Sequence, residues 1–459
     1  MTTKTPSAGL TSYRMLWRWH FYAGLFAIPF VLLLSITGAL YLFKPQIEAW
    51  QERHYNHLQL TGAHTVPSQQ VAAALAAVPG SVLNAYQLPD SPQSAVRVLV
   101  GKGDQLYRVY VRPDTLQVLG TVAEDSRLMR VLFHLHGELL LGDRGSMLVE
   151  LAASWTIVLL LTGLYLWWPR QHRLAGILYP RLHGGKRLFW RDLHAVTGFW
   201  VSSFALFLLL SGLPWAKSWG GMLKSVRQLN LSAPLQQDWT TGRSSELAER
   251  RAANTPTMAG MHEHGAMAPP AATDYSPLDR LVPRIEPLGL AAPVLIAPPS
   301  QRSPTWTARS DAQNRPLRTT LKLDPTSGAT LQRTDFSQRP LLDRIIGIGV
   351  AAHEGQLFGW FNQLLGVLTA IGLILMSVGA LLMWWRRRRP GQLGAPAAPA
   401  APRLAGALVV LIGLLGLLLP LLGLSLIAVL IIERTVLRHL PAARHFLGLP
   451  EKERNPANN

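Results

Sequence analysis

Histidines at matched positions are the feature of this sequence that could carry chemistry. The chain contains 14 histidines, and four of them recur in two copies of one pattern. His20 and His194 each stand four residues before a glycine, in the segments WRWHFYAG and RDLHAVTG. His136 and His353 each stand six residues before a glycine, in the segments HGELLLG and HEGQLFG. Because a neutral imidazole is a common ligand of transition metals, the matched pairs predict two metal sites.

Two imidazoles that face each other suit the two axial positions of a haem iron. With both positions filled, no site remains on the iron for oxygen or substrate, so such a haem carries electrons. The sequence has no cysteine, which excludes covalent c-type haem attachment, thiolate iron–sulfur clusters and disulfides. We therefore expect two haem b groups, one held by His20 and His194 and one by His136 and His353. His134 is the alternative ligand to His136, although an alanine stands at its matched position in the second copy.

Arginines flank the histidines of the first pair in the sequence. They could neutralise haem propionates, or they could serve only as topology anchors, since basic residues gather at the cytoplasmic ends of spanning helices. The propionate candidates are Arg14, Arg18, Arg187 and Arg191.

A weaker candidate metal site lies in a segment rich in proline, alanine and methionine. Thioether and imidazole groups suit copper(I) and several divalent ions. The residues of this soft-metal candidate are Met261, His262, His264 and Met267. The surrounding segment, 252–273, has the composition of a disordered insert.

Four long apolar runs must position the matched histidines. Hydrophobic residues make up 49% of the chain. They gather into runs that each reach the length of about 20 residues that a spanning helix needs. The first run is longer than the apolar core of a signal peptide and no Ala-x-Ala site follows it, so we expect an uncleaved anchor. The predicted spans are 17–43, 147–168, 194–216 and 360–385.

A fifth apolar run, 404–432, carries Pro420 and Gly423 near its middle. The run fits either one kinked span or a tight helical hairpin. The basic tail that follows it favours the hairpin, whereas the run is short for two full crossings.

The distribution of charge sets the expected orientation. The formal net charge is +18, but the basic residues concentrate in short loops beside the spans, which indicates a membrane topology and no nucleic-acid partner. The stretch from Lys44 to Ser146, by contrast, holds nine basic and nine acidic residues. Short basic loops stay cytoplasmic, so the expected inner segments are 1–16, 169–193 and 386–403. The expected outer segments are 44–146 and 217–359, and the tail is 433–459.

The two outer segments show the same kinds of element. Each contains stretches that alternate between apolar and polar residues on either side of a turn, as antiparallel strands do. The first also contains a helix that starts near Pro67. The alternating stretches are 94–100, 106–112 and 116–122 in the first segment, and 317–323 and 329–332 in the second. Each segment therefore predicts a small α+β domain, and the chain as a whole predicts a duplicated unit of helix, outer domain and helix.

At these residues the chain resembles the PepSY-associated transmembrane family. The resemblance rests on the segment from Trp17 to Gly24, the segment FHLHG that contains His136, the segment from Arg191 to Gly198, and the pair HE at His353. It covers most of residues 12–390. It implies an integral membrane α-helical bundle of four core helices plus a C-terminal fifth apolar segment, with two small PepSY-like α+β domains in the periplasm.

The resemblance also implies a function, because the FoxB-type members of the family are inner-membrane siderophore reductases that bind haem b. By motif position, His20, His194, His136 and His353 are the residues carried over as haem ligands. The expected activity is reduction of a periplasmic ferric siderophore or other metal complex, with electrons from an unidentified cytoplasmic or membrane donor. The rival expectation is a non-redox accessory or sensor protein of the bacterial inner membrane, whose PepSY-like domains bind a periplasmic partner.

Overall fold

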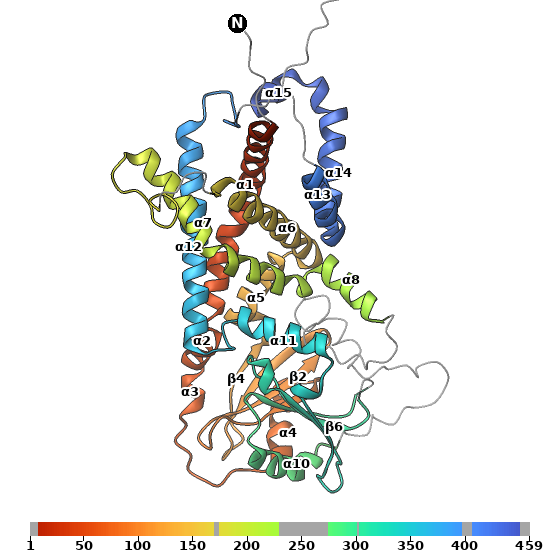
Figure 1. The fold of residues 1–459 in the computed structure, drawn as a ribbon. Coiled ribbons are helices and arrows are strands. Elements are labelled where there is room, and N and C mark those ends of the chain that lie inside the picture. The colour runs from red at the N-terminus through yellow and green to blue at the C-terminus, as the bar shows by residue number, and fades with distance from the viewer. Residues whose placement is uncertain (1–7, 169–173, 229–273, 301–302, 397–405, 450–459) are drawn as a thin grey trace, which may run out of the picture. The chain divides into compact units, whose positions relative to one another are not determined.

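The chain folds into two compact units, each built from segments that are far apart in the sequence (Figure 1). The computed structural model describes residues 8–168, 174–228, 274–300, 303–396 and 406–449. The membrane unit comprises Met1–Ala39, His136–Leu231 and Leu364–Asn459. The sheet unit comprises Leu40–Leu135 and Ser232–Gln363.

Four helices in the described residues are long and apolar enough to cross a membrane. They are α1 (Ala8–Tyr41), α6 (Gly142–Trp167), α7 (Lys186–Gly212) and α12 (Trp360–Arg387). Each overlaps one of the four predicted spans, so helices that could cross a membrane are present where the sequence predicted them. The observed helices α6 and α7 begin earlier than predicted, because polar residues at their N-termini continue the helix beyond the apolar run.

The fifth apolar run forms a helical hairpin, the second of the two forms that its sequence allowed. Helix α13 (Gly406–Leu418) and helix α14 (Pro420–Thr435) lie side by side (Figure 1). The chain reverses at Leu419, and Gly416 and Gly423 come into backbone contact, where a Cβ on Gly423 would lie 2.5 Å from the carbonyl oxygen of Gly416. At 1.5 Å per residue the two helices are about 20 and 24 Å long, shorter than the hydrocarbon layer of about 30 Å.

A buried carboxylate in α6 holds the start of α8 (Lys217–Gln228), the helix that follows α7. Glu150 is 2% exposed and accepts hydrogen bonds from the backbone N–H groups of Ser218, at 2.8 Å, and Trp219, at 3.1 Å. The first N–H groups of a helix lack partners within the helix and favour a negative charge. The partners of the Glu150 carboxylate are therefore backbone groups of α8. These hydrogen bonds fix the direction in which the chain continues after the short 3-10 turn Leu213–Trp215, which ends the third span.

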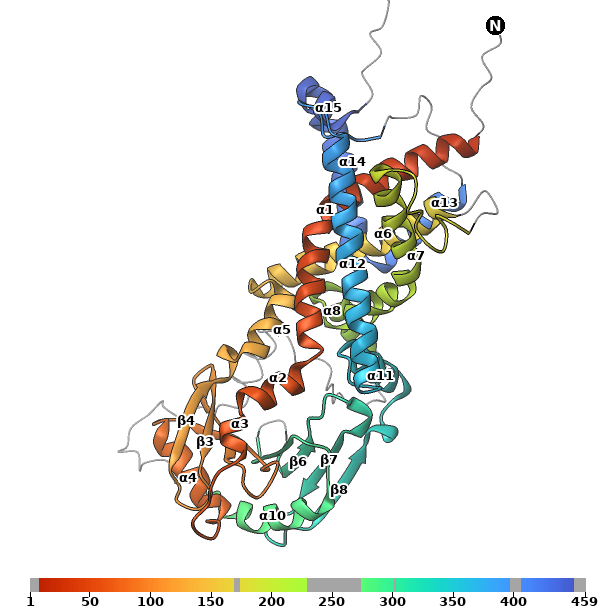
Figure 2. The ribbon, with the colours of Figure 1, turned by 90° about the vertical axis from the view of Figure 1, so that its left-hand side faces the viewer.

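The segments 44–146 and 217–359 contribute one antiparallel sheet of eight strands in the order β4-β3-β2-β1-β5-β6-β7-β8 (Figure 2). The first segment supplies α2 (Lys44–Gln51), α3 (Arg53–Asn56), α4 (Pro67–Ala77), β1 (Val82–Gln87), β2 (Val96–Lys102), β3 (Gln105–Val111) and β4 (Val118–Ala123). The second supplies α10 (Pro277–Ile285), β5 (Val294–Ala297), β6 (Trp306–Ser310), β7 (Thr319–Leu323) and β8 (Thr330–Asp335). Each segment thus contains a helix, α4 or α10, followed by a four-stranded meander. The sequence predicted only three of the strands in the first segment and two in the second, and it did not predict α10.

The two meanders are joined where the sequence predicted separate domains. Strands β1 and β5 pair antiparallel, with Tyr86 opposite Ile296 and Gln87 opposite Leu295. Asp279 of α10 accepts hydrogen bonds from the backbone N–H of Ser68, at 2.8 Å, and from its hydroxyl, at 2.6 Å, at the start of α4. The meanders therefore share one sheet, and their division into two PepSY-like domains stays a prediction.

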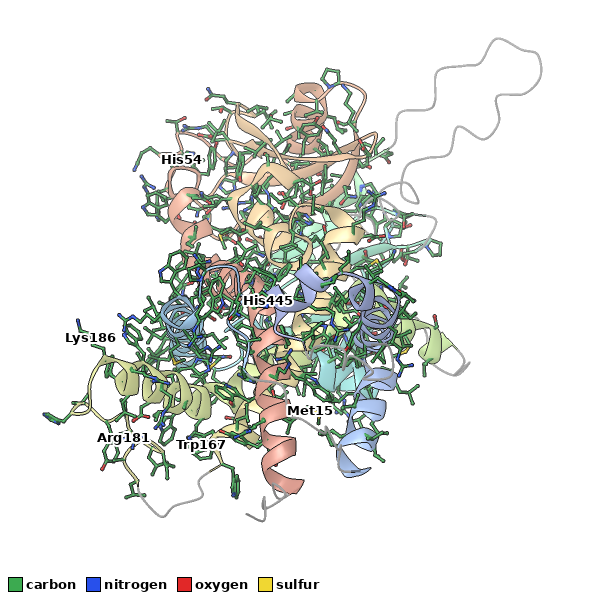
Figure 3. The ribbon with its side chains drawn as sticks, turned by 90° about the horizontal axis from the view of Figure 1, so that it is seen from above. Met15, His54, Trp167, Arg181, Lys186 and His445 are labelled. Carbon is green, nitrogen blue, oxygen red and sulfur yellow. The ribbon has the colours of Figure 1, made fainter. Side chains whose placement is uncertain are left out.

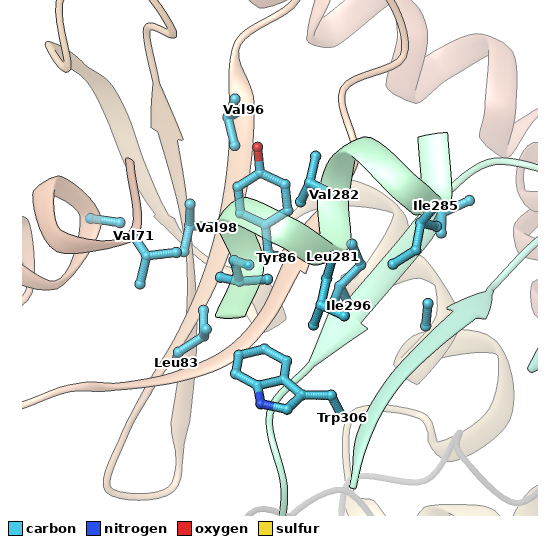
Figure 4. Close-up of a cluster of buried hydrophobic side chains, with 14 of the residues drawn as sticks. Val71, Leu83, Tyr86, Val96, Val98, Leu281, Val282, Ile285, Ile296 and Trp306 are labelled. Atoms are coloured by element: carbon cyan, nitrogen blue, oxygen red, sulfur yellow. The ribbon is translucent and has the colours of Figure 1, made fainter. Parts of the chain in front are cut away.

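One hydrophobic core lies between this sheet and the helices α4 and α10 (Figure 4). The side chains of Val71 from α4 and Leu281 from α10 are fully buried. They meet strand residues of both halves, such as Val98 of β2 and Ile296 of β5, which are also fully buried. The core residues recur at every second position along the strands, so one face of the sheet is buried.

Ion pairs connect the start of α3 and the turn that follows β4 to strands β2 and β3 of the sheet. Glu52 bonds Arg97 at 2.9 Å and Arg127 at 2.7 Å, and Glu124 bonds Arg108 at 3.0 Å and Arg127 at 2.9 Å. Burial opposes ionisation of Glu124, but Arg108 and Arg127 together outweigh it and hold its pKa at about 2, below the ordinary 4.5. The pKa of Glu52 is lowered in the same way, against its burial, by Arg97 and Arg127.

We expect the sheet unit to lose stability in acid. Because the folded-state pKa of Glu124 lies below its unfolded value, its contribution is complete above about pH 4.5 and is lost as the pH falls toward 2. Thermal unfolding of the purified protein followed between pH 7 and pH 3 should show a falling midpoint temperature. Glu124→Gln should flatten this dependence, whereas the exposed Glu286→Gln should leave it unchanged. Equal slopes in all three proteins would contradict the assignment.

Candidate functional site

The histidines of the first predicted pair lie close together in the membrane unit. His20 is on α1 and His194 is on α7, and both side chains are partly buried. Their ring centres are 6.5 Å apart and their ring planes are nearly perpendicular, at 85°. Two residues from distant parts of the sequence are thus neighbours at one end of the helices, which is where their matched positions in the duplicated unit led us to expect them.

One nitrogen of each ring is engaged by a neighbouring helix. The Nδ1 atom of His20 lies 2.9 Å from the hydroxyl oxygen of Thr162 on α6, and that of His194 lies 2.8 Å from the carbonyl oxygen of Met376 on α12. A carbonyl oxygen only accepts, so the Nδ1 of His194 carries the proton and its Nε2 carries the lone pair. Histidines that bind metals are usually held in this way by their second nitrogen.

The distance between the two ring centres can be compared with the distance that a metal bound to both rings would require. Metal–imidazole bonds of about 2.0–2.1 Å, plus about 1 Å from each nitrogen to its ring centre, give ring centres about 6 Å apart. The observed 6.5 Å fits such a metal. Within the described part of the chain, no three His, Asp or Glu side chains gather as a protein metal site. Two protein ligands suit a metal whose other ligands belong to a macrocycle, and haem is such a group.

Close contacts between the helices hold the two rings in place. Gly163 on α6 faces His20, where a Cβ would lie 3.2 Å from the Cε1 atom of the ring. A Cβ on Gly372 of α12 would overlap a methyl carbon of Val201 on α7, so these two helices approach through a glycine. The rings of Trp167 and Phe199 stack with centres 4.3 Å apart and join α6 to α7.

The four arginine candidates have different surroundings. Arg14 and Arg187 are exposed, and Arg191 pairs with the buried Asp192 at 2.8 Å, which Arg181 of the basic loop also bonds at 2.7 Å. Figure 3 shows this loop, with Arg181 and Lys186 labelled, together with Trp167 at the end of α6. Asp192 therefore already balances part of the charge of the loop.

Arg18 is 6% exposed and donates to the carbonyl oxygens of Pro396, at 2.6 Å, and Gly448, at 2.7 Å. Gly448 follows α15 (Pro441–Leu447). The guanidinium thus holds the C-terminal segment against the start of the first span. A role of Arg18 toward a propionate stays a prediction.

Arg387, the last residue of α12, is not among the candidates predicted from the sequence, but it lies close to the residue that follows His20. Its guanidinium carbon lies 5.2 Å from the ring centre of Phe21, the residue after His20, and 5.8 Å from that of Trp17. Its charge also interacts with that of Arg187. Among the described residues, the ion pairs include neither arginine. The sequence signal for Arg387 was its place beside Trp384-Trp385 at the end of the fourth span.

His136 lies on α5 (Leu128–Glu138) and belongs to the membrane unit. Its Nδ1 lies 2.9 Å from the hydroxyl oxygen of Thr37 on α1, and a Cβ on Gly38 would lie 3.1 Å from its ring. Burial lowers the pKa of His136 to about 4, and a hydrogen bond with the Leu34 backbone offsets this only in part. The ring is therefore neutral at pH 7, as a metal ligand must be.

The remaining candidates lie elsewhere. His353 is the last residue of α11 (Leu341–His353), and His134 packs edge to face on Phe133 with ring centres 5.5 Å apart; both belong to the sheet unit. The pairing of His136 with His353, and the choice between His134 and His136, stay predictions. The soft-metal candidate formed by Met261, His262, His264 and Met267 lies outside the described residues.

The chain matches a known protein family over most of its length. The model of the PepSY-associated TM region matches residues 17–387 and so covers most of the chain, including all four matched histidines. No curated protein matches the chain. Since the match spans the four helices and everything between them, the chain belongs to the PepSY-associated transmembrane family.

Proposed function

We propose that this protein is a haem b-containing membrane reductase that carries electrons across the bilayer. The observation that supports it most is the geometry of His20 and His194, whose ring centres are 6.5 Å apart and whose Nδ1 atoms both have partners on neighbouring helices. The chain contributes the two Nε2 atoms, and a haem bound between them would take up and pass on single electrons.

The surrounding residues fit this role. The helices α1, α6, α7 and α12 supply both rings and both Nδ1 partners, so the pair rests on regular helices and not on loops. Arg187 and Arg387 place positive charge near the same end of the helices, where haem propionates would need it. From the sequence, His136 and His353 are proposed as the ligands of a second haem.

The proposed acceptor is a ferric siderophore or another metal complex on the periplasmic side of the bacterial inner membrane. The charge distribution supports an inner position for the basic loops and an outer position for the segments that form the sheet. Reduction of iron(III) to iron(II) would weaken binding by hard oxygen donors and so release the metal from its chelator.

A visible spectrum tests the proposal. Protein purified from cells with an adequate supply of haem should show sharp b-type bands that change on reduction with dithionite, with about two haems per chain, one for each matched pair. A ferric siderophore added to the reduced protein should then reoxidise it. Protein that is folded and free of haem would contradict the proposal and favour the accessory or sensor function.

A further inference from the structure

A threonine hydroxyl lies within hydrogen-bonding distance of the imidazole of His20. Thr162 lies within the apolar span α6, and its Oγ1 lies within hydrogen-bonding distance of three atoms. They are the Nδ1 atom of His20, at 2.9 Å, and two carbonyl oxygens one turn earlier in the same helix, that of Val158 at 2.7 Å and that of Leu159 at 3.3 Å. The single hydroxyl proton can serve only one of these neighbours.

The hydrogen bonds can all be satisfied in only one way. The Val158 carbonyl cannot donate, so the hydroxyl proton must point at it to avoid two facing lone pairs at 2.7 Å. The hydroxyl oxygen is then an acceptor, and the Nδ1 of His20 must carry the ring proton. The lone pair of the neutral ring is therefore on Nε2, the nitrogen that is left to bind a metal.

We infer that Thr162 is a positioning residue for His20, which fixes the ring proton on Nδ1 and thereby prepares Nε2 as the haem ligand. The inference rests on the proposed function for the identity of the bound group. The same arrangement recurs at His136, where Thr37 lies 2.9 Å from Nδ1 and donates to the carbonyl oxygen of Leu33 at 2.8 Å.

In the second copy of the duplicated unit, the Nδ1 atom of His194 also carries the ring proton, but its hydrogen-bond partner belongs to the backbone. When the Trp-Trp pairs that end α6 and α12 are aligned, Gly379 stands at the position that matches Thr162. A glycine has no hydroxyl, and His194 instead donates from Nδ1 to the Met376 carbonyl at 2.8 Å. A side-chain substitution can therefore remove the Nδ1 partner of His20, whereas the partner of His194 belongs to the backbone.

The test compares three variants. Thr162→Val keeps the shape of the side chain and removes the acceptor, and Thr162→Ser restores a hydroxyl. Thr156→Val is the matched control, because Thr156 lies on the same helix, is 6% exposed and donates to the Ala152 carbonyl at 2.7 Å, away from the His20 ring. The measurements are haem affinity, the midpoint potential of each haem, and the ring ¹⁵N shifts of histidine-labelled protein without haem.

We expect Thr162→Val to weaken haem binding at one of the two sites by about 10-fold or more, as loss of a ligand's hydrogen-bond partner usually does. The midpoint potential of that haem should rise, since a ring that has lost its acceptor donates less charge to the oxidised iron. In haem-free protein the His20 signals should move from the Nδ1-protonated form toward the Nε2-protonated form. Thr162→Ser and Thr156→Val should resemble the wild type.

The outcomes separate this inference from the proposed function. Wild-type protein that never binds haem would overturn the proposed function, while the ¹⁵N shifts still report the ring proton. If the wild type binds haem and Thr162→Val has the same haem affinity and midpoint potentials, the inference is overturned and the proposed function is not. If Thr162→Val fails to fold, Thr162→Ser provides the test. Loss of haem from Thr162→Ser, which keeps a hydroxyl group, would also overturn the inference about Thr162.

Discussion

Replacing His194 with alanine should remove about half of the haem that we propose this protein binds, because one of the two proposed sites would lose an axial ligand. The remaining haem should keep its reduced b-type spectrum, since His136 belongs to another part of the chain. His20→Ala should have the same effect, as the two rings are expected to bind one iron. Haem per chain, measured as the pyridine haemochrome against protein concentration, gives the direct readout.

The control for this prediction is His183→Ala, which changes an exposed histidine of the basic loop and should leave the haem content unchanged. Imidazole added to His194→Ala protein gives a second check, because a small ligand can fill the space of the lost side chain. Partial recovery of haem on adding imidazole would show that the loss was local. Two full equivalents of haem in both His20→Ala and His194→Ala would exclude the pair as ligands.

The closeness of His20 and His194 could be predicted because the two copies of a duplicated sequence can be aligned with each other. One histidine at the start of a span is ambiguous, but His20 and His194 stand before matched glycines in two runs of similar length. The apolar runs also predict the spans well, because a bilayer demands a minimum length of apolar helix whatever the tertiary structure. The repeated motif and the apolar runs can each be read from short stretches of sequence, and the structure has helices at all four runs.

The features that were missed depend on contacts between distant residues. Nothing in the sequences of β1 and β5 indicates that the two meanders should pair. The pairing appears only in the structure, where Tyr86 lies opposite Ile296 and Gln87 opposite Leu295. Thr162 is likewise one hydroxyl within an apolar helix, and such hydroxyls are common because they can bond their own helix. Its importance follows only from the position of His20, which lies 142 residues earlier in the chain.

A strained turn connects the helix that carries His136 to the second span, and a glycine makes it possible. Leu139 and Leu140, which follow α5, both have left-handed backbone angles, with φ of 52° and 58°. Non-glycine residues rarely adopt this conformation, and two in succession need support from their surroundings. That support comes from α6, where Gly145 packs directly against the carbonyl group of Glu138.

The methyl group added by Gly145→Ala should therefore destabilise the fold strongly. The added Cβ would overlap the Glu138 carbonyl oxygen and lie 2.6 Å from its carbon, and a backbone group cannot rotate away as a side chain can. Overpacking of this kind costs about 3 kcal/mol or more when helices must move apart. We expect low yields in detergent, a clearly lower midpoint of thermal unfolding and loss of haem at the His136 site.

Gly137→Ala is the matched control, because Gly137 lies on α5 beside His136 and a Cβ there meets nothing within 4 Å. Alanine is the better helix former by about 1 kcal/mol, so this variant should be at least as stable as the wild type. If the two variants unfolded at the same temperature, the contact of Gly145 with Glu138 could not be what holds the turn. If only Gly145→Ala loses stability and haem together, the turn both supports the fold and sets the position of the His136 ring.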